Sequence, residues 1–113
     1  MKNHTKEKII EFTKRETGWH FGTGEPALSE IADQALIIVN IANFFGFETD
    51  AFPGISGEIM IAVYHNHDYL EFICEVDNSI VFVHEKDGVE VAYKEELTFD
   101  QAKEELYKFG EDL

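Results

Sequence analysis

The sequence predicts an α+β fold with the element order ααββββα, in which the helices pack mainly on one face of a four-stranded antiparallel meander. Apolar residues recur with helical spacing in residues 3–16, 27–45 and 98–113. Between residues 59 and 95 they alternate with polar residues instead, as in half-buried strands. The chain has 113 residues, of which 44% are hydrophobic, so residues 1–113 are expected to form one domain around one core.

The first helix is predicted over residues 3–16. Ile9 and Phe12 give it a narrow apolar stripe that can face a core. Two basic residues suit its last turn electrostatically, and Gly18 supplies the stop.

The next segment, TGWHFGTGEP at residues 17–26, predicts a glycine-rich loop. Its glycines match neither the phosphate-binding loop, which needs a following Gly-Lys-Ser/Thr, nor the dinucleotide fingerprint, which needs a preceding strand. Trp19 and Phe21 are expected to close the edge of the core. Trp19 and His20 are also candidates for contact with a ligand.

The second helix is predicted from Ala27 to Phe45, with Pro26 in its first turn and Gly46 as its stop. Its middle, ALIIVNIANFF, is apolar around most of the circumference, so one sheet contact cannot bury all of it. The first helix can cover part of the remainder. A second copy of the chain, in a homodimer, is expected to cover the rest. It is also expected to cover the face of the meander opposite the main core, which carries Met60, Tyr64, Tyr69 and Ile73.

Residues 46–57 carry Gly, Asp and Pro and predict a connecting loop. Strands then follow with turns at residues 65–68, 77–79 and 86–88, which predicts an antiparallel meander. Thr98 with Gln101 three residues later is typical of a capping box, so a last helix should begin there.

The charge distribution restricts the class of partner. The net charge of −14 disfavours nucleic acid, and the shortage of Lys and Arg disfavours phosphate-bearing substrates. Five of the nine cations lie in the first fifteen residues, whereas the stretch from Glu16 to Glu85 has twelve carboxylates and no Lys or Arg. These acids serve either as a solvated surface that keeps the protein soluble or as a surface for a basic protein partner.

The expected location is the cytoplasm. Cys74 is the only cysteine, so there is no intrachain disulfide framework. The first residues lack the apolar region of a signal peptide, and the longest apolar segment is too short and interrupted to span a membrane. No membrane partner is therefore expected.

The motif His65-Asn66-His67-Asp68 lies between two apolar runs. Its first interpretation is a hairpin turn, because Asn and Asp tolerate the positive φ that tight turns require. The alternative is a surface metal site, since His65, His67 and Asp68 are suitable ligand types.

The remaining candidates lie in the following strand. Glu71 and Glu75 share one face, where they are either the polar side of a half-buried strand or a pair of carboxylates able to bind a partner or do acid–base work. Cys74 belongs to the alternation of the opposite face and is expected to be an inert core thiol. No catalytic residue is assigned and no cofactor is expected.

A set of short motifs between residues 24 and 76 resembles a loose group of small uncharacterised bacterial proteins. The motifs are Gly24-Glu25-Pro26, a long apolar helix, Phe52-Pro53, Gly57-Glu58-Ile59 and Leu70-Glu71-Phe72. The group often has an acid followed by Trp at the positions of Ala62 and Val63, where this chain departs from it. The resemblance implies an α+β fold and no particular activity.

The functional expectation is a non-enzymatic, acidic interaction protein that binds a basic protein partner, in the manner of immunity or antitoxin proteins. The alternative is a metal-binding protein or small enzyme that uses the histidines of the hairpin turn and the central carboxylates.

Overall fold

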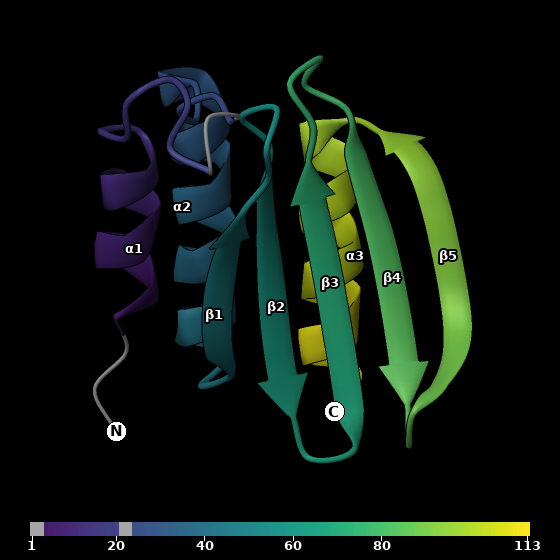
Figure 1. The fold of residues 1–113 in the computed structure, drawn as a ribbon. Coiled ribbons are helices and arrows are strands. Elements are labelled where there is room, and N and C mark those ends of the chain that lie inside the picture. The colour runs from purple at the N-terminus through teal and green to yellow at the C-terminus, as the bar shows by residue number, and fades with distance from the viewer. Residues whose placement is uncertain (1–3, 21–23) are drawn as a thin grey trace.

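The computed structural model describes residues 4–20 and 24–113. Its elements are α1 (Thr5–Phe12), α2 (Ser29–Phe44), β1 (Glu48–Pro53), β2 (Ile59–His65), β3 (Asp68–Cys74), β4 (Ile80–Lys86), β5 (Val89–Leu97) and α3 (Phe99–Glu111). The strands form one antiparallel sheet in the order β1-β2-β3-β4-β5. Figure 1 shows α2 and α3 behind the sheet and α1 beside β1. The α+β class and the antiparallel meander are thus confirmed.

The predicted order ααββββα, with four strands, was wrong because it lacks one strand. Residues 46–57, predicted as a connecting loop, contain β1. This strand pairs with β2 from Glu48 opposite Tyr64 to Pro53 opposite Ile59. Only Ala51 of the strand is buried, so the alternation of Glu, Thr, Asp, Ala and Phe is hard to recognise as a strand. Proline is tolerated at Pro53 because β1 lies at an edge of the sheet.

The first two helices are shorter than predicted. α1 ends at Phe12, before the basic residues and Gly18. Pro26 lies ahead of α2 rather than in its first turn, because Leu28 is extended and serves as the N-cap. The Ala27 N–H donates to the Phe12 carbonyl (3.1 Å), which ties this segment to the end of α1. The predicted stop at Gly46 and the predicted start at Thr98 are confirmed: Gly46 has φ 80°, and Thr98 and Gln101 form a reciprocal capping box.

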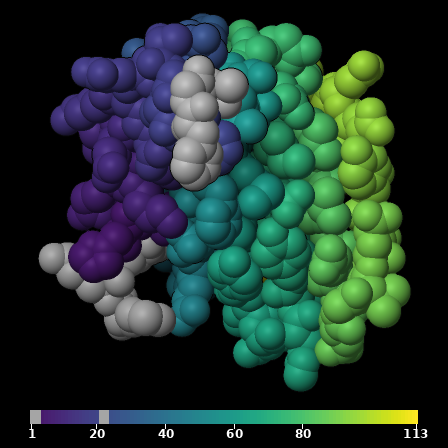
Figure 2. Space-filling view, viewed as in Figure 1, coloured from purple at the N-terminus to yellow at the C-terminus, as the bar shows by residue number. Residues whose placement is uncertain are grey.

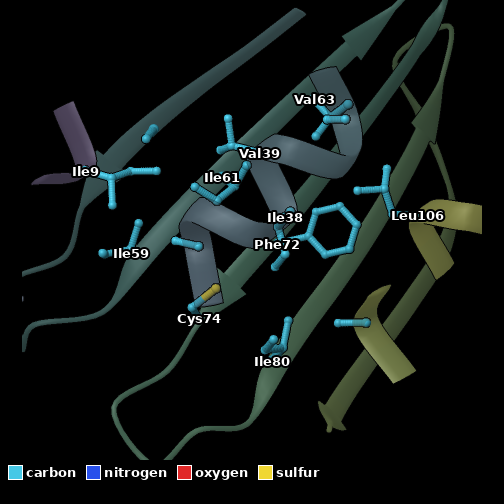
Figure 3. Packing of buried hydrophobic residues seen from close by; sticks show 14 of the residues in the cluster. Ile9, Ile38, Val39, Ile59, Ile61, Val63, Phe72, Cys74, Ile80 and Leu106 are labelled. Carbon is cyan, nitrogen blue, oxygen red and sulfur yellow. The ribbon is translucent and has the colours of Figure 1, made fainter. Parts of the chain in front are cut away.

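The core lies between the sheet and the helices (Figure 3). Ile38 and Val39 of α2 pack with Ile61 and Phe72 of the sheet, and Leu106 of α3 closes the cluster beside them. α1, α3 and the sheet together cover most of the apolar band of α2. Two apolar residues of α2 stay exposed, at 42% for Ile37 and 81% for Phe44.

The homodimer stays a prediction, and Phe44 gives the variant that tests it. We expect light scattering after size exclusion to give twice the 13.0 kDa mass of one chain. Phe44→Ser should return the mass to that of one chain, because it removes the most exposed apolar side chain of α2. Asn40→Ser, also at an exposed position of α2, is the control. A monomer at every protein concentration would contradict the expectation.

Cys74 is buried on the helix side of the sheet, as its alternation predicted. Burial, with a smaller effect of the Glu75 charge, raises the pKa of the Cys74 thiol to about 12. We therefore expect a thiol reagent at neutral pH to react with the folded protein about 100-fold more slowly than with the denatured chain. Equal rates in the two states would show that Cys74 is accessible.

Candidate functional site

One face of the sheet has no helix on it, and it is called the open face below. Figure 2 looks directly at it: the surfaces of β2 to β5 fill the centre and right of the view, and α1 is visible at the left. The strand register places its side chains in rows that cross the sheet. The first row is Glu48, Tyr64, Tyr69, Glu85 and Glu90; the second is Asp50, Ala62, Glu71, Val83 and Tyr93; the third is Phe52, Met60, Ile73 and Val81.

Aromatic and aliphatic side chains are distributed across the open face, from β1 to β5. Phe52, Tyr64 and Tyr93 are exposed at 39%, 42% and 52%. The rings of Tyr64 and Tyr69 lie side by side, with centroids 5.4 Å apart. Ala62 and Val83 are buried between these larger neighbours. Several apolar side chains of this face are thus partly exposed, and no described helix covers them.

Carboxylates lie among and around these apolar residues. Within residues 4–20 and 24–113, the pair between Lys8 of α1 and Asp50 is the only Lys–carboxylate ion pair on the open face. Burial acts to raise the pKa of Asp50, but hydrogen bonds from Lys8 and the Ala51 N–H, with the charge of Lys8, outweigh it and lower the pKa below its usual value. The ammonium of Lys8 also lies 5.0 Å from the Phe52 ring centroid. A cation thus already contacts both an acid and an aromatic ring at one edge of this face.

Tyr69 and Glu71 form the best-defined polar pair of the open face. The Tyr69 hydroxyl donates to Glu71 Oε1 at 2.7 Å. Burial, this hydrogen bond and the nearby charges of Glu71 and Glu85 raise the pKa of Tyr69 well above its usual value. The stability that neutral Tyr69 contributes is therefore fully present below the ordinary tyrosine pKa, and it is lost progressively as the pH rises from that value through the higher pKa of the folded state.

A substitution at Glu71 tests this pair. Glu71→Gln should lower the pKa of Tyr69 toward its ordinary value, because it removes a neighbouring negative charge and weakens the acceptor. Tyrosine ring signals followed by NMR through an alkaline titration measure the change. Glu104→Gln, on α3, is the control and should leave the Tyr69 titration as it is. An unchanged Tyr69 titration in Glu71→Gln would mean that burial and the other nearby charges determine its pKa without Glu71.

Glu75 lies beyond the end of β3 on the same face. Burial, with the charges of Glu58 and Asp77, raises its pKa above the usual value for glutamate. A positive group near Glu75 would relieve this repulsion. Of the predicted binding residues, Glu71 and Glu75 thus belong to one acidic surface.

Trp19 and His20 lie elsewhere, in the loop between α1 and α2. Their rings contact edge to face with centroids 5.6 Å apart, and the Arg15 guanidinium lies 4.6 Å from the Trp19 ring. Trp19 Nε1–H donates to the Glu25 carbonyl at 2.8 Å. These contacts give Trp19 a role in holding its own loop. Phe21, predicted to act with it, lies outside the described residues.

The histidine motif is a hairpin turn between β2 and β3, with Asn66 at φ 54°. Its members have different contacts. The His65 ring packs on Phe47 at 4.9 Å, and the His67 ring pairs with Asp87 at 3.0 Å. Asp68 Oδ1 lies within hydrogen-bond distance of His84 Nε2, at 2.8 Å.

No group of three or more His, Cys, Asp or Glu side chains is arranged to hold a metal ion in the part of the chain that the structure describes. The metal site at His65, His67 and Asp68 therefore remains a prediction from sequence, without geometric support. Its ligands would have to exchange their present contacts for the metal.

The pair of His84 and Asp68 borders a cavity of about 350 Å³ on the helix side of the sheet. Phe82 and Phe109 are among its apolar lining residues, and Lys86, Glu105 and Lys108 are among its charged ones. A His–Asp pair can act as a base, but none of the described residues that line the cavity is a Ser, Thr or Cys able to serve as a nucleophile. The sequence could not reveal this pair, because sixteen residues separate its members and only the strand register joins them.

Comparison with protein-family models, curated protein sequences and solved structures finds no match to this chain. Among the described residues, none of the helices combines the length and apolar character needed to cross a membrane.

Proposed function

We propose that this chain is an acidic, non-enzymatic interaction protein whose open face binds a basic protein partner. One observation carries the proposal: the open face has exposed aromatic side chains, and among them lie carboxylates that have few basic neighbours. Apolar contact supplies the affinity of such an interface, and complementary charge supplies orientation and association rate. The most specific version of this proposal is an immunity-like or antitoxin-like protein, which covers the basic surface of another protein.

Two properties of the open face favour a protein over other ligands. Its exposed rings belong to Phe and Tyr, which are enriched in protein interfaces. Its acids, Glu48, Glu71 and Glu85 among them, would repel phosphate groups, so nucleic acid is not a suitable partner. A side chain of Lys or Arg could lie against a tyrosine ring and a glutamate at once, as Lys8 does with Phe52 and Asp50.

Calorimetry with a defined probe tests the proposal. The probe is a nine-residue peptide of alternating lysine and valine, equal in length to β5, and its counterpart has glutamate in place of lysine. We expect the basic peptide alone to bind, and its affinity to fall as salt rises from about 20 to about 200 mM.

Two triple variants that remove the same charge distinguish binding at a local site from an effect of the total charge. Neutralising Glu48, Glu71 and Glu85 to glutamine should weaken binding by about tenfold. Neutralising Glu30, Glu104 and Glu111, on the helices, removes the same charge and should weaken it by less than about threefold. Equal losses in the two triples, or no binding of the basic peptide, would overturn the proposal.

The alternative is a metal-binding protein or small enzyme, and the His84–Asp68 pair at its cavity is the observation in its favour. A thermal-shift series with divalent metals distinguishes the two. If one metal stabilises the protein and the double variant His65→Asn with His67→Asn loses this stabilisation, the metal site is at the hairpin turn. If His84→Asn loses it instead, the metal site is at the cavity.

A further inference from the structure

The two edges of the sheet differ. At β1, α1 packs along the strand, and the Thr5 hydroxyl donates to the Thr49 carbonyl at 2.9 Å. At β5, Figure 1 shows nothing beyond the strand, and the described part of the chain provides no element that pairs with its outer side. Residues along a regular strand direct their N–H and C=O groups alternately to the two sides. β5 shifts register against β4 between His84 and Glu85 and between Ile80 and Phe82, so this alternation is regular in its middle, from Ala92 to Lys94, where outward backbone groups are free to pair. Such an edge can accept another strand.

The side chains of β5 indicate which strand it would accept. Val89 and Val91 are exposed at 65% and 56%. Glu90, Glu95 and Glu96 are exposed acids, whereas the only cation of the strand, Lys94, is paired with Glu105 of α3. β5 therefore combines exposed valines with an excess of negative charge along a free edge.

This charge argues against a second copy of the chain as the occupant. Two copies paired through β5 would bring their glutamates together, and like charges across a strand pair destabilise it. The same glutamates would stabilise a strand that carries Lys or Arg. Natural proteins use edge charges in this way to prevent pairing between identical strands.

We infer that β5 is the element onto which an extended basic segment of the partner adds as a further strand of the sheet. The inference rests on the proposed function and states how the partner is held. Glu90 lies in the row of Glu85, and Tyr93 lies in the row of Glu71 and Val83. A strand added beside β5 would thus extend the rows of the open face, and its basic side chains would reach Glu90 and Tyr93. Backbone hydrogen bonds supply affinity in this mode, and alternate side chains supply specificity.

Amide hydrogen exchange on the full chain tests the inference with the lysine–valine peptide as the probe. We expect exchange of outward amides in β5 to slow by about tenfold or more when the peptide is bound. Amides in β1 are the internal control and should be unaffected. A peptide with the same side chains and N-methylated backbone keeps the charge but cannot donate, and it should bind about tenfold more weakly.

The outcomes separate this inference from the proposed function. If the peptide binds, responds to the open-face triple variant, and leaves the β5 amides unprotected, strand addition is wrong and the acidic interface stands. Equal affinity of the N-methylated peptide would have the same meaning. If the peptide does not bind at all, both are overturned.

Discussion

Replacing Phe72 with alanine is expected to lower the free energy of unfolding by about 3–5 kcal/mol. Phe72 is fully buried on the helix side of β3 and packs against Phe82, with ring centroids 5.1 Å apart. Truncation removes its buried apolar surface and leaves a cavity that its neighbours fill only in part. Denaturant unfolding followed by circular dichroism measures the loss.

Tyr64→Ala is the matched control on the other side of the sheet. Tyr64 is a large aromatic residue of β2 whose ring lies on the open face. Its truncation should cost about 1 kcal/mol, the usual scale for a partly exposed side chain. A loss in Tyr64→Ala as large as that in Phe72→Ala would show that the open face is needed mainly for folding, which would weaken its assignment as a binding surface.

Reversing two charges on the open face should invert its preference for ligands. In the double variant Glu71→Lys with Glu85→Lys, we expect the lysine–valine peptide to bind about 100-fold more weakly, because attraction becomes repulsion where the aromatic residues are exposed. The glutamate–valine peptide, which the wild-type chain should reject, is expected to bind the variant. Calorimetry with both peptides measures the inversion.

The control reverses the same number of charges on the helices, in Glu30→Lys with Glu104→Lys. This variant changes net charge equally but leaves the open face intact, so it should retain binding of the basic peptide. A comparable loss in both double variants would mean that overall charge determines binding and that the open face has no special role.

Elements with strong periodicity were predictable from the sequence. The four strands from Ile59 onward alternate over several residues and are separated by recognisable turns, and the last helix has both its capping box and its apolar stripe. β1 was missed because an edge strand buries few side chains and tolerates Pro53, so its pattern resembles a loop. The start of α2 was misplaced because Leu28 is extended and Ala27 bonds to the Phe12 carbonyl at the end of α1, a contact remote in sequence that the apolar pattern does not show.

The candidate site was predictable only in part. The alternation of β3 placed Glu71 and Glu75 on one face and Cys74 on the other. The sequence also predicted that the helices pack mainly on one face, which leaves the other face without a helix, and the structure places α2 and α3 on one side of the sheet. The sequence could not show that Tyr69, Glu85 and Glu90 lie in one row, because strand register is a tertiary property.

The central claim is that the open face is where a basic partner binds, and NMR mapping on isotope-labelled protein tests it most directly. As the lysine–valine peptide is added, the account predicts that the largest chemical-shift changes occur on the open face at Tyr69, Glu71, Glu85 and Tyr93 and along β5, with small changes in α2 and α3. Largest changes on the outer sides of these helices, or no localised changes at all, would contradict it.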